Sequence, residues 1–284
     1  MMVYNRITKE YEENYQHGAI ALNFLYNTVI GRILLKIIIN PVISKIIGFY
    51  HDTFLSKGKI NKFISKHNID ISSYEKKEYK NFNEFFTREK KDKKITRKKG
   101  EFASPADSKL LIYKISNNLK VRIKDSEYTL DELVDNKINL NDYKNGYCLV
   151  FRLALDDYHR YCFPDSGTIS ESYNIKGKLH TVSSISKDYK IYKENHRVIT
   201  KLNTDNFQDI IYIEVGALSV GKIINHDLKK YKSCDEKGYF KMGGSTIVIL
   251  TKDKVLNIDN DILKHATKDI EVKIKYGEKI GTNK

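Results

Sequence analysis

Residues 101–284 contain a succession of short apolar segments that turn residues separate. Nine such segments follow one another at residues 110–115, 119–123, 147–155, 168–175, 197–202, 210–215, 220–224, 246–250 and 270–276. In the last of them Val272, Ile274 and Tyr276 alternate with polar or small residues, which is the period of a strand with one buried face. Segments of helical length and period are lacking, which argues against parallel strand–helix–strand units. We therefore expect a mostly antiparallel, β-sandwich or barrel-like domain.

The first hundred residues have a different pattern and are expected to be helical. The most apolar part is residues 14–55, where aliphatic residues recur at mostly helical spacings. A membrane-spanning helix needs ~20 predominantly apolar residues, and the uncharged stretch 14–31 is too short for one. We predict two helices with a break near Asn40 and Pro41, because proline disfavours helix in the residue before it. Polar helix is predicted for residues 56–100, so the chain as a whole is of the α+β class.

Charge is concentrated in the same region. The chain has a formal net charge of +14, and residues 1–100 contribute +10, from 20 Lys+Arg against 10 Asp+Glu. Such an excess implies a polyanionic partner, either nucleic acid or an anionic membrane surface. No zinc-finger, ribonucleoprotein or helix-turn-helix signature supports nucleic acid. Apolar helices with Lys and Arg along them suit a membrane interface, whereas a helical pair packed on the protein's own core has the same pattern. The charge favours the membrane, and the segment 88–99, with eight basic and two acidic residues, would add attraction for anionic lipid.

Cysteine usage and the N-terminus indicate a cellular compartment. The three cysteines, Cys148, Cys162 and Cys234, are widely spaced and show neither a disulfide framework nor metal-type pairing. A reducing cytoplasmic setting fits best. The sequence shows no signal-peptide pattern of a basic and then an apolar region with a small-residue cleavage site.

Three residues have the chemical types that nucleophilic catalysis requires. Asp107 follows a Ser-Pro-Ala turn before a predicted strand, His159 lies in a polar cluster after another, and Ser245 follows two glycines. A serine nucleophile needs a base, usually a neutral imidazole, and the base needs a group that fixes its tautomer. Taken alone, each of the three is more often structural, and a Gly-Gly turn before a core strand explains the surroundings of Ser245 equally well. No nucleotide-binding glycine loop, nucleophile elbow or zinc spacing occurs, so no metal is expected.

Seven short blocks in a fixed order resemble those of the phosphatidylserine decarboxylase family of pyruvoyl-dependent membrane enzymes. Along the chain they are Phe85-Phe86-Thr87-Arg88, Ser104-Pro105-Ala106-Asp107, Asp157-Tyr158-His159-Arg160 with Pro164 and Gly167, Leu179-His180-Thr181-Val182, Glu194-Asn195-His196-Arg197-Val198, Val215-Gly216-Ala217 with Val220-Gly221, and Gly238-Tyr239-Phe240 followed by Gly244-Ser245-Thr246. Each block is weak alone, but seven in the right order are specific. The resemblance runs from about residue 80 to the C-terminus.

The resemblance implies that Ser245 attacks the carbonyl of Gly244 and moves the acyl group from nitrogen to oxygen. Elimination then leaves a dehydroalanine, which becomes a pyruvoyl group, the covalent form of pyruvate, at the new N-terminus. The proenzyme would split into a β chain, 1–244, and an α chain, 245–284. The pyruvoyl carbonyl would form a Schiff base with the amine of phosphatidylserine and act as electron sink while CO2 leaves, with phosphatidylethanolamine as the product and no added cofactor.

Two residues depart from the family's pattern. Gly243 replaces the leucine that usually precedes the scissile Gly-Ser pair, which is expected to make the turn more pliable. Cys162 stands where the family has a second histidine that commonly serves self-cleavage. His159 is therefore the predicted base, with Asp107 as its carboxylate, and His159 is also the candidate that returns a proton after decarboxylation. The further candidates for the base are His180, His196 and Cys162.

These observations predict a membrane-associating region, 1–100, and a self-cleaved catalytic domain, 101–284. The expected location is the cytoplasmic face of the cell membrane, with phosphatidylserine in an anionic surface as substrate, no nucleic acid as partner, and a homodimer left open. A pyruvoyl-dependent decarboxylase of a soluble amino acid shares the Ser245 chemistry but leaves the apolar N-terminus unexplained. A basic β-rich module that binds membranes or nucleic acid without any reaction is the alternative from a different class.

Overall fold

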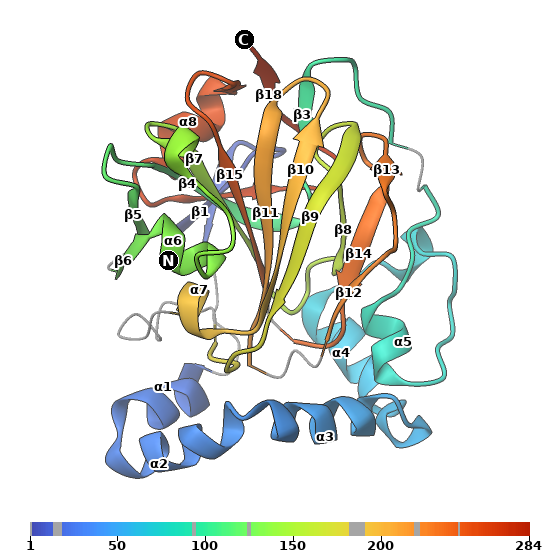
Figure 1. Ribbon diagram of the computed structural model, residues 1–284. Coiled ribbons are helices and arrows are strands. Elements are labelled where there is room, and N and C mark those ends of the chain that lie inside the picture. The colour runs from blue at the N-terminus through green and yellow to red at the C-terminus, as the bar shows by residue number, and fades with distance from the viewer. Residues whose placement is uncertain are drawn as a thin grey trace.

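Ten strands form one sheet through the centre of the molecule (Figure 1). A computed structural model describes residues 2–13, 19–92, 95–123, 126–181, 191–218, 222–243 and 245–284. In order across the sheet the strands are β13 (Lys230–Tyr231), β9 (Gly167–Ile175), β10 (Arg197–Thr204), β11 (Gln208–Gly216), β15 (Ser245–Thr251), β7 (Tyr147–Leu153), β4 (Ser108–Lys114), β17 (Glu271–Ile274), β1 (Met2–Asn5) and β2 (Glu10–Glu13). Neighbouring strands are antiparallel except β1 and β17, which are parallel. Strand β15 lies inside the sheet, between β11 and β7, and is buried along its whole length.

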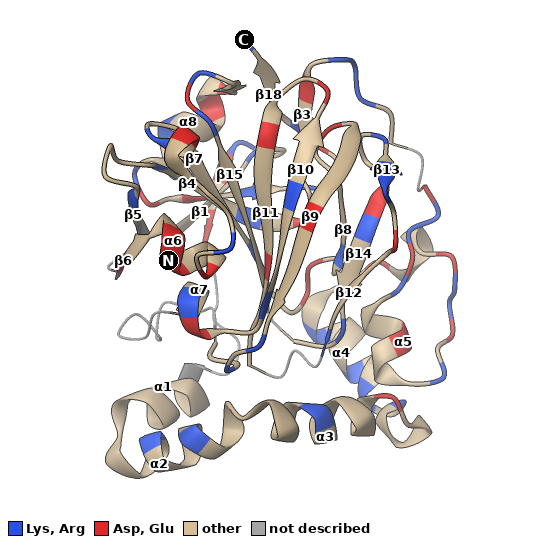
Figure 2. Ribbon diagram, in the orientation of Figure 1, with Lys and Arg blue, Asp and Glu red and all other residues tan. Residues whose placement is uncertain are grey.

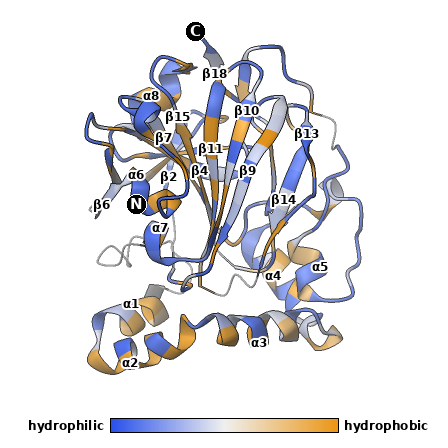
Figure 3. Cartoon of the chain, viewed as in Figure 1, coloured by the Kyte–Doolittle hydropathy of each residue, from blue (hydrophilic) through white to orange (hydrophobic). Residues whose placement is uncertain are grey.

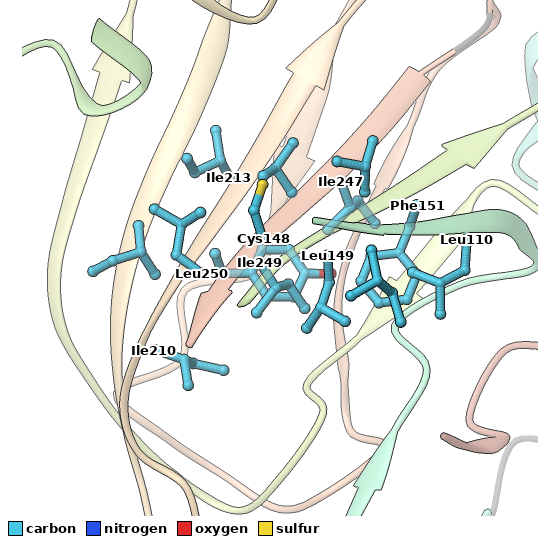
Figure 4. Close-up of a cluster of buried hydrophobic side chains, with 14 of the residues drawn as sticks. Leu110, Cys148, Leu149, Phe151, Ile210, Ile213, Ile247, Ile249 and Leu250 are labelled. Atoms are coloured by element: carbon cyan, nitrogen blue, oxygen red, sulfur yellow. The ribbon is translucent and has the colours of Figure 1, made fainter. Parts of the chain in front are cut away.

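Smaller sheets share the core of the large one. They are β12 (Ile223–Asn225), β14 (Glu236–Phe240) and β8 (Arg160–Cys162); β16 (Leu256–Ile258), β18 (Lys279–Asn283) and β3 (Glu101–Ala103); and the pair β5 (Lys120–Ile123) and β6 (Ser126–Thr129). Phe102 of β3, Tyr161 of β8 and Phe240 of β14 belong to the same hydrophobic cluster as the central strands. Figure 4 shows the middle of this cluster, where apolar side chains such as Leu110 and Ile247 meet.

The α+β class with a large, mostly antiparallel sheet is confirmed. Eight of the nine predicted strand segments coincide with β4, β5, β7, β9, β10, β11, β15 and β17, and the segment 220–224 lies partly outside the described residues. The sequence pattern missed β1 and β2, which pair with each other and join β17. Strand β2 is rich in glutamate and has no apolar alternation, so only the neighbouring strand makes it extended. Residues 2–13 therefore belong to the sheet and not to the helical region predicted for 1–100.

Helices carry most of the N-terminal region and lie beside one end of the sheet (Figure 1). The helices of this region are α1 (Ala19–Asn27), α2 (Val29–Ile38), α3 (Pro41–His51), α4 (Lys59–His67) and α5 (Phe82–Phe86), with the 3-10 turns η1 (Phe54–Ser56) and η2 (Ile71–Ser73). Later in the chain follow α6 (Leu130–Val134), η3 (Asn141–Tyr143), α7 (Ile191–Glu194) and α8 (Asn260–Ala266). The predicted polar helix over 56–100 is thus replaced by α4, α5 and irregular segments.

The apolar stretch is divided at two places. Helix α3 begins with Pro41 after the cap residue Asn40, whose side chain accepts a hydrogen bond from the Val42 amide, so the predicted break there is confirmed. A second break was not predicted. Thr28 caps α2 by accepting from the Gly31 amide, and a Cβ added to Gly31 would lie 1.9 Å from the Phe24 carbonyl oxygen. The close approach of α1 and α2 thus depends on a glycine.

The first three helices expose an apolar surface. Among the described residues no single helix is long and apolar enough to cross a membrane, and α1 and α2, which pass together by composition, meet at an angle of 102°. Figure 3 shows apolar residues along these helices, and Figure 2 shows few charges on them, all basic on α2 and α3. We call this surface the apolar platform; its exposed members are Ile20, Phe24, Val29, Ile30, Ile33, Leu34, Ile37, Val42, Ile46, Phe49, Phe54 and Leu55.

The basic segment 88–99 is partly engaged inside the protein. Arg88 is buried and lies over the Tyr74 ring. Lys90 pairs with Asp107, and Arg97 donates through Nε to the carbonyl of Gly277. Lys93 and Lys94 lie outside the described residues. The segment is therefore a weaker source of attraction for lipid than its composition suggested.

Candidate active site

Ser245 is the first residue of β15, and cross-strand neighbours enclose it. It lies opposite Gly216 of β11 on one side and Leu153 of β7 on the other. Its side chain is fully buried, and its Oγ has no hydrogen-bond partner among the described residues. A buried polar group left unpaired costs roughly 1–3 kcal/mol, so such a hydroxyl is a candidate for a functional role, although the Thr200 and Thr246 hydroxyls are also unpaired among the described residues. Gly244, the other half of the predicted cleavage site, lies outside the described residues.

Helix α5 holds the turn that precedes Ser245. The amide of Met242 donates to Asn83 Oδ1 at 3.1 Å, and the Met242 side chain packs against the aromatic cluster that includes Phe86. Gly243 has a φ of 136°, a value that favours glycine over other residues. The leucine usual at this position would be strained in this backbone. Gly243, predicted to make the turn pliable, instead suits the conformation of the turn.

His159 is buried as a neutral imidazole. Its Nδ1 lies 2.9 Å from the carbonyl oxygen of Asp157, which only accepts, so Nδ1 carries the proton and Nε2 has a free lone pair. Among the described residues Nε2 has no partner. The ring packs on Phe86 with 4.0 Å between centroids. Burial, reinforced by the nearby Arg88 guanidinium, lowers the pKa of His159 to about 3, so the imidazole is neutral at physiological pH.

Two connections bring His159 to the same end of the sheet as Ser245. Leu153, the cross-strand neighbour of Ser245, ends β7, and the chain turns back from Ala154, whose amide donates to Asp157 Oδ2 at 2.7 Å. His159 follows that turn, and its carbonyl accepts from the amide of Phe240 at 2.9 Å, shortly before the turn that leads into β15. The neutral imidazole of His159 and the buried hydroxyl of Ser245, both unpaired as far as the described residues show, thus lie in the same region.

Asp107 lies in a different environment from the one predicted. Its carboxylate accepts from the Tyr276 amide at 2.7 Å and pairs with Lys90 at 3.2 Å and Lys275 at 3.8 Å. Burial alone would raise the pKa of Asp107, but the two ammonium groups and the amide hold it below its usual value. No contact joins Asp107 to His159 in the described part of the chain, and the Asp157 carbonyl occupies Nδ1 instead. Two cations attract a carboxylate more strongly than a neutral imidazole does.

The other candidate bases have different surroundings. Cys162 is fully buried and its Sγ donates to the Ser104 carbonyl at 3.5 Å. Burial and the neighbouring Cys234 raise the pKa of the Cys162 thiol well above its usual value, which opposes a role as base. His196 bonds the Ile175 carbonyl through Nδ1 at 3.1 Å. His180 lies 3.3 Å from a tyrosine hydroxyl of α1.

Two asparagines near Ser245 were missed by reasoning from sequence. Asn83 holds the turn before β15, and Asn195 donates to the carbonyl of Gly216 opposite Ser245 at 2.7 Å. Both stand within or next to blocks that carry the family resemblance, but asparagine has no charge or nucleophile to mark it. Among the described residues no group of His, Cys, Asp and Glu is arranged to hold a metal ion.

Comparison with known proteins gives a consistent result. The sequence profile of the family described as phosphatidylserine decarboxylase matches residues 82–282. The chain is 51% identical to phosphatidylserine decarboxylase proenzyme 2 of Clostridium acetobutylicum, over 98% of this chain and 97% of that protein. It is 38% identical to the phosphatidylserine decarboxylase proenzyme of Clostridium beijerinckii, over 99% of both chains, and 39% identical to that of Clostridium botulinum strain Kyoto, also over 99% of both. The similarity to these relatives therefore extends over the N-terminal helices, which the profile does not cover.

Proposed function

The chain belongs to the phosphatidylserine decarboxylase family, and we propose on that premise that it is a proenzyme that cuts itself between Gly244 and Ser245 and then converts phosphatidylserine to phosphatidylethanolamine. The observation that carries the proposal is the Ser245 hydroxyl at the first position of an inner strand, which is buried and has no partner among the residues that the structure describes. Gly243, two residues before Ser245, has a backbone conformation that favours glycine. His159, a neutral imidazole, follows the turn after β7, the strand that pairs with β15.

The proposed self-cleavage uses groups of this chain alone. His159 Nε2 takes the proton of the Ser245 hydroxyl, and Oγ attacks the carbonyl carbon of Gly244. The peptide C–N bond breaks, its nitrogen receives the proton, and an ester joins Gly244 to the serine side chain. Loss of the Ser245 α-proton then expels the Gly244 carboxylate from Cβ. The resulting dehydroalanine tautomerises to an imine, and water hydrolyses it with release of ammonia.

Ser245 is the proposed source of the pyruvoyl cofactor, and its burial fits that role. The new N-terminus would start a strand that is hydrogen-bonded on both sides, so the group is held rigidly and away from bulk water. The pyruvoyl group supplies a carbonyl that binds the substrate amine and takes up the electron pair released with CO2. His159 is proposed to return the proton to carbon. Asp107 is proposed to hold Lys90 beside Tyr158, whose ring lies 4.5 Å from Lys90 Nζ, and not to orient the imidazole.

The two proposed chains are interleaved in the sheet. Three strands of the α chain, residues 245–284, lie between strands of the β chain, residues 1–244, or beside them. Strand β15 pairs with β11 and β7, β17 pairs with β4 and β1, and β18 pairs with β3. We therefore expect the cut enzyme to remain one particle. The predicted division into 1–100 and 101–284 does not separate the sheet from the helices, because residues 2–13 already belong to the sheet.

The apolar platform is the proposed membrane contact. Its apolar side chains form stripes along α2 and α3, and Arg32, Lys36 and Lys45 are exposed among them. An apolar face flanked by basic residues suits the plane of an anionic bilayer surface. Twelve exposed apolar side chains against three basic ones indicate that insertion outweighs charge. We therefore propose that the protein binds peripherally to the membrane surface, on the cytoplasmic side.

Replacing two platform residues by aspartate is expected to lower vesicle binding by roughly a hundredfold, about tenfold for each lost apolar contact. Ile33→Asp and Phe49→Asp suit this test, because these side chains are 59% and 72% exposed and the fold does not need them. Cosedimentation with phosphatidylserine vesicles measures the effect. Ile7→Asp is the matched control, since Ile7 is 69% exposed but lies between β1 and β2.

Wild-type binding should persist at about 1 M salt, where the screening length is only about 3 Å. Release of the wild-type protein by salt would show that charge, and not insertion, dominates. Equal loss of binding in Ile7→Asp and in the platform variant would contradict the assignment of the surface.

The proposed function is tested by mass analysis under denaturing conditions and by a substrate assay. We expect two chains, 1–244 and 245–284, with a pyruvoyl group at the start of the second. Phosphatidylserine in vesicles should lose CO2, whereas free serine offered side by side should not. A single 33.1 kDa chain from active cells would reject self-cleavage. Equal turnover of free serine would favour a pyruvoyl-dependent decarboxylase of soluble amino acids.

A further inference from the structure

Three contacts join the helix pair α1 and α2 to the segments around Ser245. The hydroxyl of Tyr26 on α1 accepts from the Thr181 amide at 3.0 Å and lies 3.3 Å from His180 Nδ1. The carbonyl of Ile39, which caps α2, accepts from the Leu179 amide at 3.1 Å. Leu218, two residues beyond the end of β11, packs against the hydrophobic cluster of these helices. The same two helices carry most of the apolar platform on their other side.

Asn195 continues this connection to the strand beside Ser245. It is fully buried, and its Oδ1 accepts from the amide of His180 at 3.0 Å. Its Nδ2 donates to two carbonyls, that of His180 at 2.9 Å and that of Gly216 at 2.7 Å. The amide side chain therefore uses both donors and its acceptor, all on main-chain groups of the buried residues His180 and Gly216.

Gly216 is the residue that this network holds in place. It is the cross-strand partner of Ser245, so its position sets one wall of the space around the serine hydroxyl. Leu179 covers it closely, since a Cβ at Gly216 would lie 3.3 Å from Leu179 Cδ2. The Leu218 amide donates to the His180 carbonyl at 3.2 Å, which ties the chain after Gly216 to the same segment. A shift of His180 therefore moves the backbone opposite Ser245.

We infer that Tyr26 and Asn195 are positioning residues that tie the lipid-facing helices to the strand end opposite Ser245, so that the seating of α1 and α2 sets the geometry in which Ser245 reacts. The inference rests on the proposed function, because it assigns a purpose to the contact between the platform and the site. Its physical basis is that buried main-chain groups lose an irreplaceable partner when either side chain is altered. Membrane contact and chemistry are then linked through four hydrogen-bonded residues, Tyr26, His180, Asn195 and Gly216.

The test compares the rate of self-cleavage in variants that change few atoms. Tyr26→Phe removes one hydroxyl, and Asn195→Asp keeps the acceptor but loses both donors. Each protein is made by cell-free synthesis, and conversion of the 33.1 kDa precursor is followed on denaturing gels. We expect Tyr26→Phe, which loses the contacts of the hydroxyl with Thr181 and His180, to be at least about fivefold slower, the effect of one lost hydrogen bond of ordinary net strength, and Asn195→Asp to be at least as slow. Tyr173→Phe is the control, because in the described part of the chain its hydroxyl bonds only Glu171 on the half-exposed strand β9.

A double variant and a binding measurement separate positioning from folding or anchoring. If the two residues act in one network, the double variant is only slightly slower than Asn195→Asp alone, whereas independent effects multiply. Vesicle binding of Tyr26→Phe should equal that of the wild type while its turnover on vesicles falls. Wild-type rates in both variants, multiplying effects, or loss of vesicle binding in parallel with activity would each overturn the inference. A wild-type chain that does not cut itself would instead reject the proposed function, and if Asn195→Asp fails to fold, Tyr26→Phe alone decides.

Discussion

Ser245→Ala is expected to leave one uncut chain of 33.1 kDa without decarboxylase activity. The substitution removes the only atom proposed to attack Gly244, and with it the source of the pyruvoyl carbonyl. Removal of a nucleophilic serine lowers rates in other enzymes by a factor on the order of 10⁶, so cleavage should be undetectable over days. Denaturing mass spectrometry and CO2 release from phosphatidylserine vesicles measure the two losses. The fold should persist, because the hydroxyl has no partner to lose among the described residues.

A matched control distinguishes chemistry from the loss of a buried hydroxyl. Thr200 of β10 is also buried, and its Oγ1 also lacks a partner among the described residues. Thr200→Val should therefore cut and decarboxylate like the wild type. Appearance of the chain 245–284 in Ser245→Ala would refute the assignment of the nucleophile.

His159→Ala is expected to slow self-cleavage by about 10²–10⁴-fold, the usual contribution of a general base, and to leave most of the proenzyme uncut. The imidazole is neutral, lies at the end of the sheet where Ser245 lies, and has no partner for Nε2 within the described part of the chain. The control is His226→Ala, since His226 is exposed and bonds Glu236 in the sheet formed by β12, β14 and β8. Normal splitting of His159→Ala would exclude His159 as the processing base. His180, whose ring is also buried, would then be the next candidate for the base.

The pH dependence of self-cleavage follows from the burial of His159. Burial lowers its pKa to about 3, below the ordinary value near 6.5, so the folded protein binds fewer protons on this residue than the unfolded chain does. The basic form therefore persists as the pH falls below 6.5, and the rate should stay level from pH 8 to about 5. Over the same interval this residue makes folding progressively less favourable, because only the unfolded chain gains its proton. A rate that halves near pH 6.5 would show that the acting histidine is solvated.

The sequence predicted seven of the ten strands of the large sheet, missed β3, β6, β8, β14, β16 and β18 of the smaller ones, and predicted the polar contacts poorly. Segments such as 246–250 and 210–215 are rich in β-branched residues, and both are buried strands in the sheet. Strand β2, with three glutamates, becomes a strand only because β1 lies beside it. The break at Pro41 was readable because proline restricts its neighbour locally. The break at Thr28 was not, because it depends on how closely Gly31 can approach a carbonyl of the preceding helix.

The candidate site shows the same division. Ser245, His159 and Asp107 were identified from residue type and from their order along the chain. The partner of each depends on folding: the Asp157 carbonyl holds His159, two lysines hold Asp107, and Asn195 holds the strand opposite Ser245. Asparagine side chains and main-chain carbonyls carry no distinctive pattern, and their effect depends on distances of about 3 Å between residues far apart in sequence.

The amino-acid sequence by itself determined the elements that local forces control: β-branched runs become buried strands, a proline ends a helix, and an apolar stretch with basic residues is amphipathic. It also carried the order of blocks that indicates a self-cleaving decarboxylase. Only the tertiary structure decided which groups meet. Among the described residues it left the Ser245 hydroxyl and His159 Nε2 buried without partners, drew Asp107 to Lys90, and connected Tyr26 of α1 to Gly216 through His180 and Asn195. The physical reason is that hydrogen bonds and charge pairs act over a few ångströms, and packing alone brings residues so distant in sequence within that range.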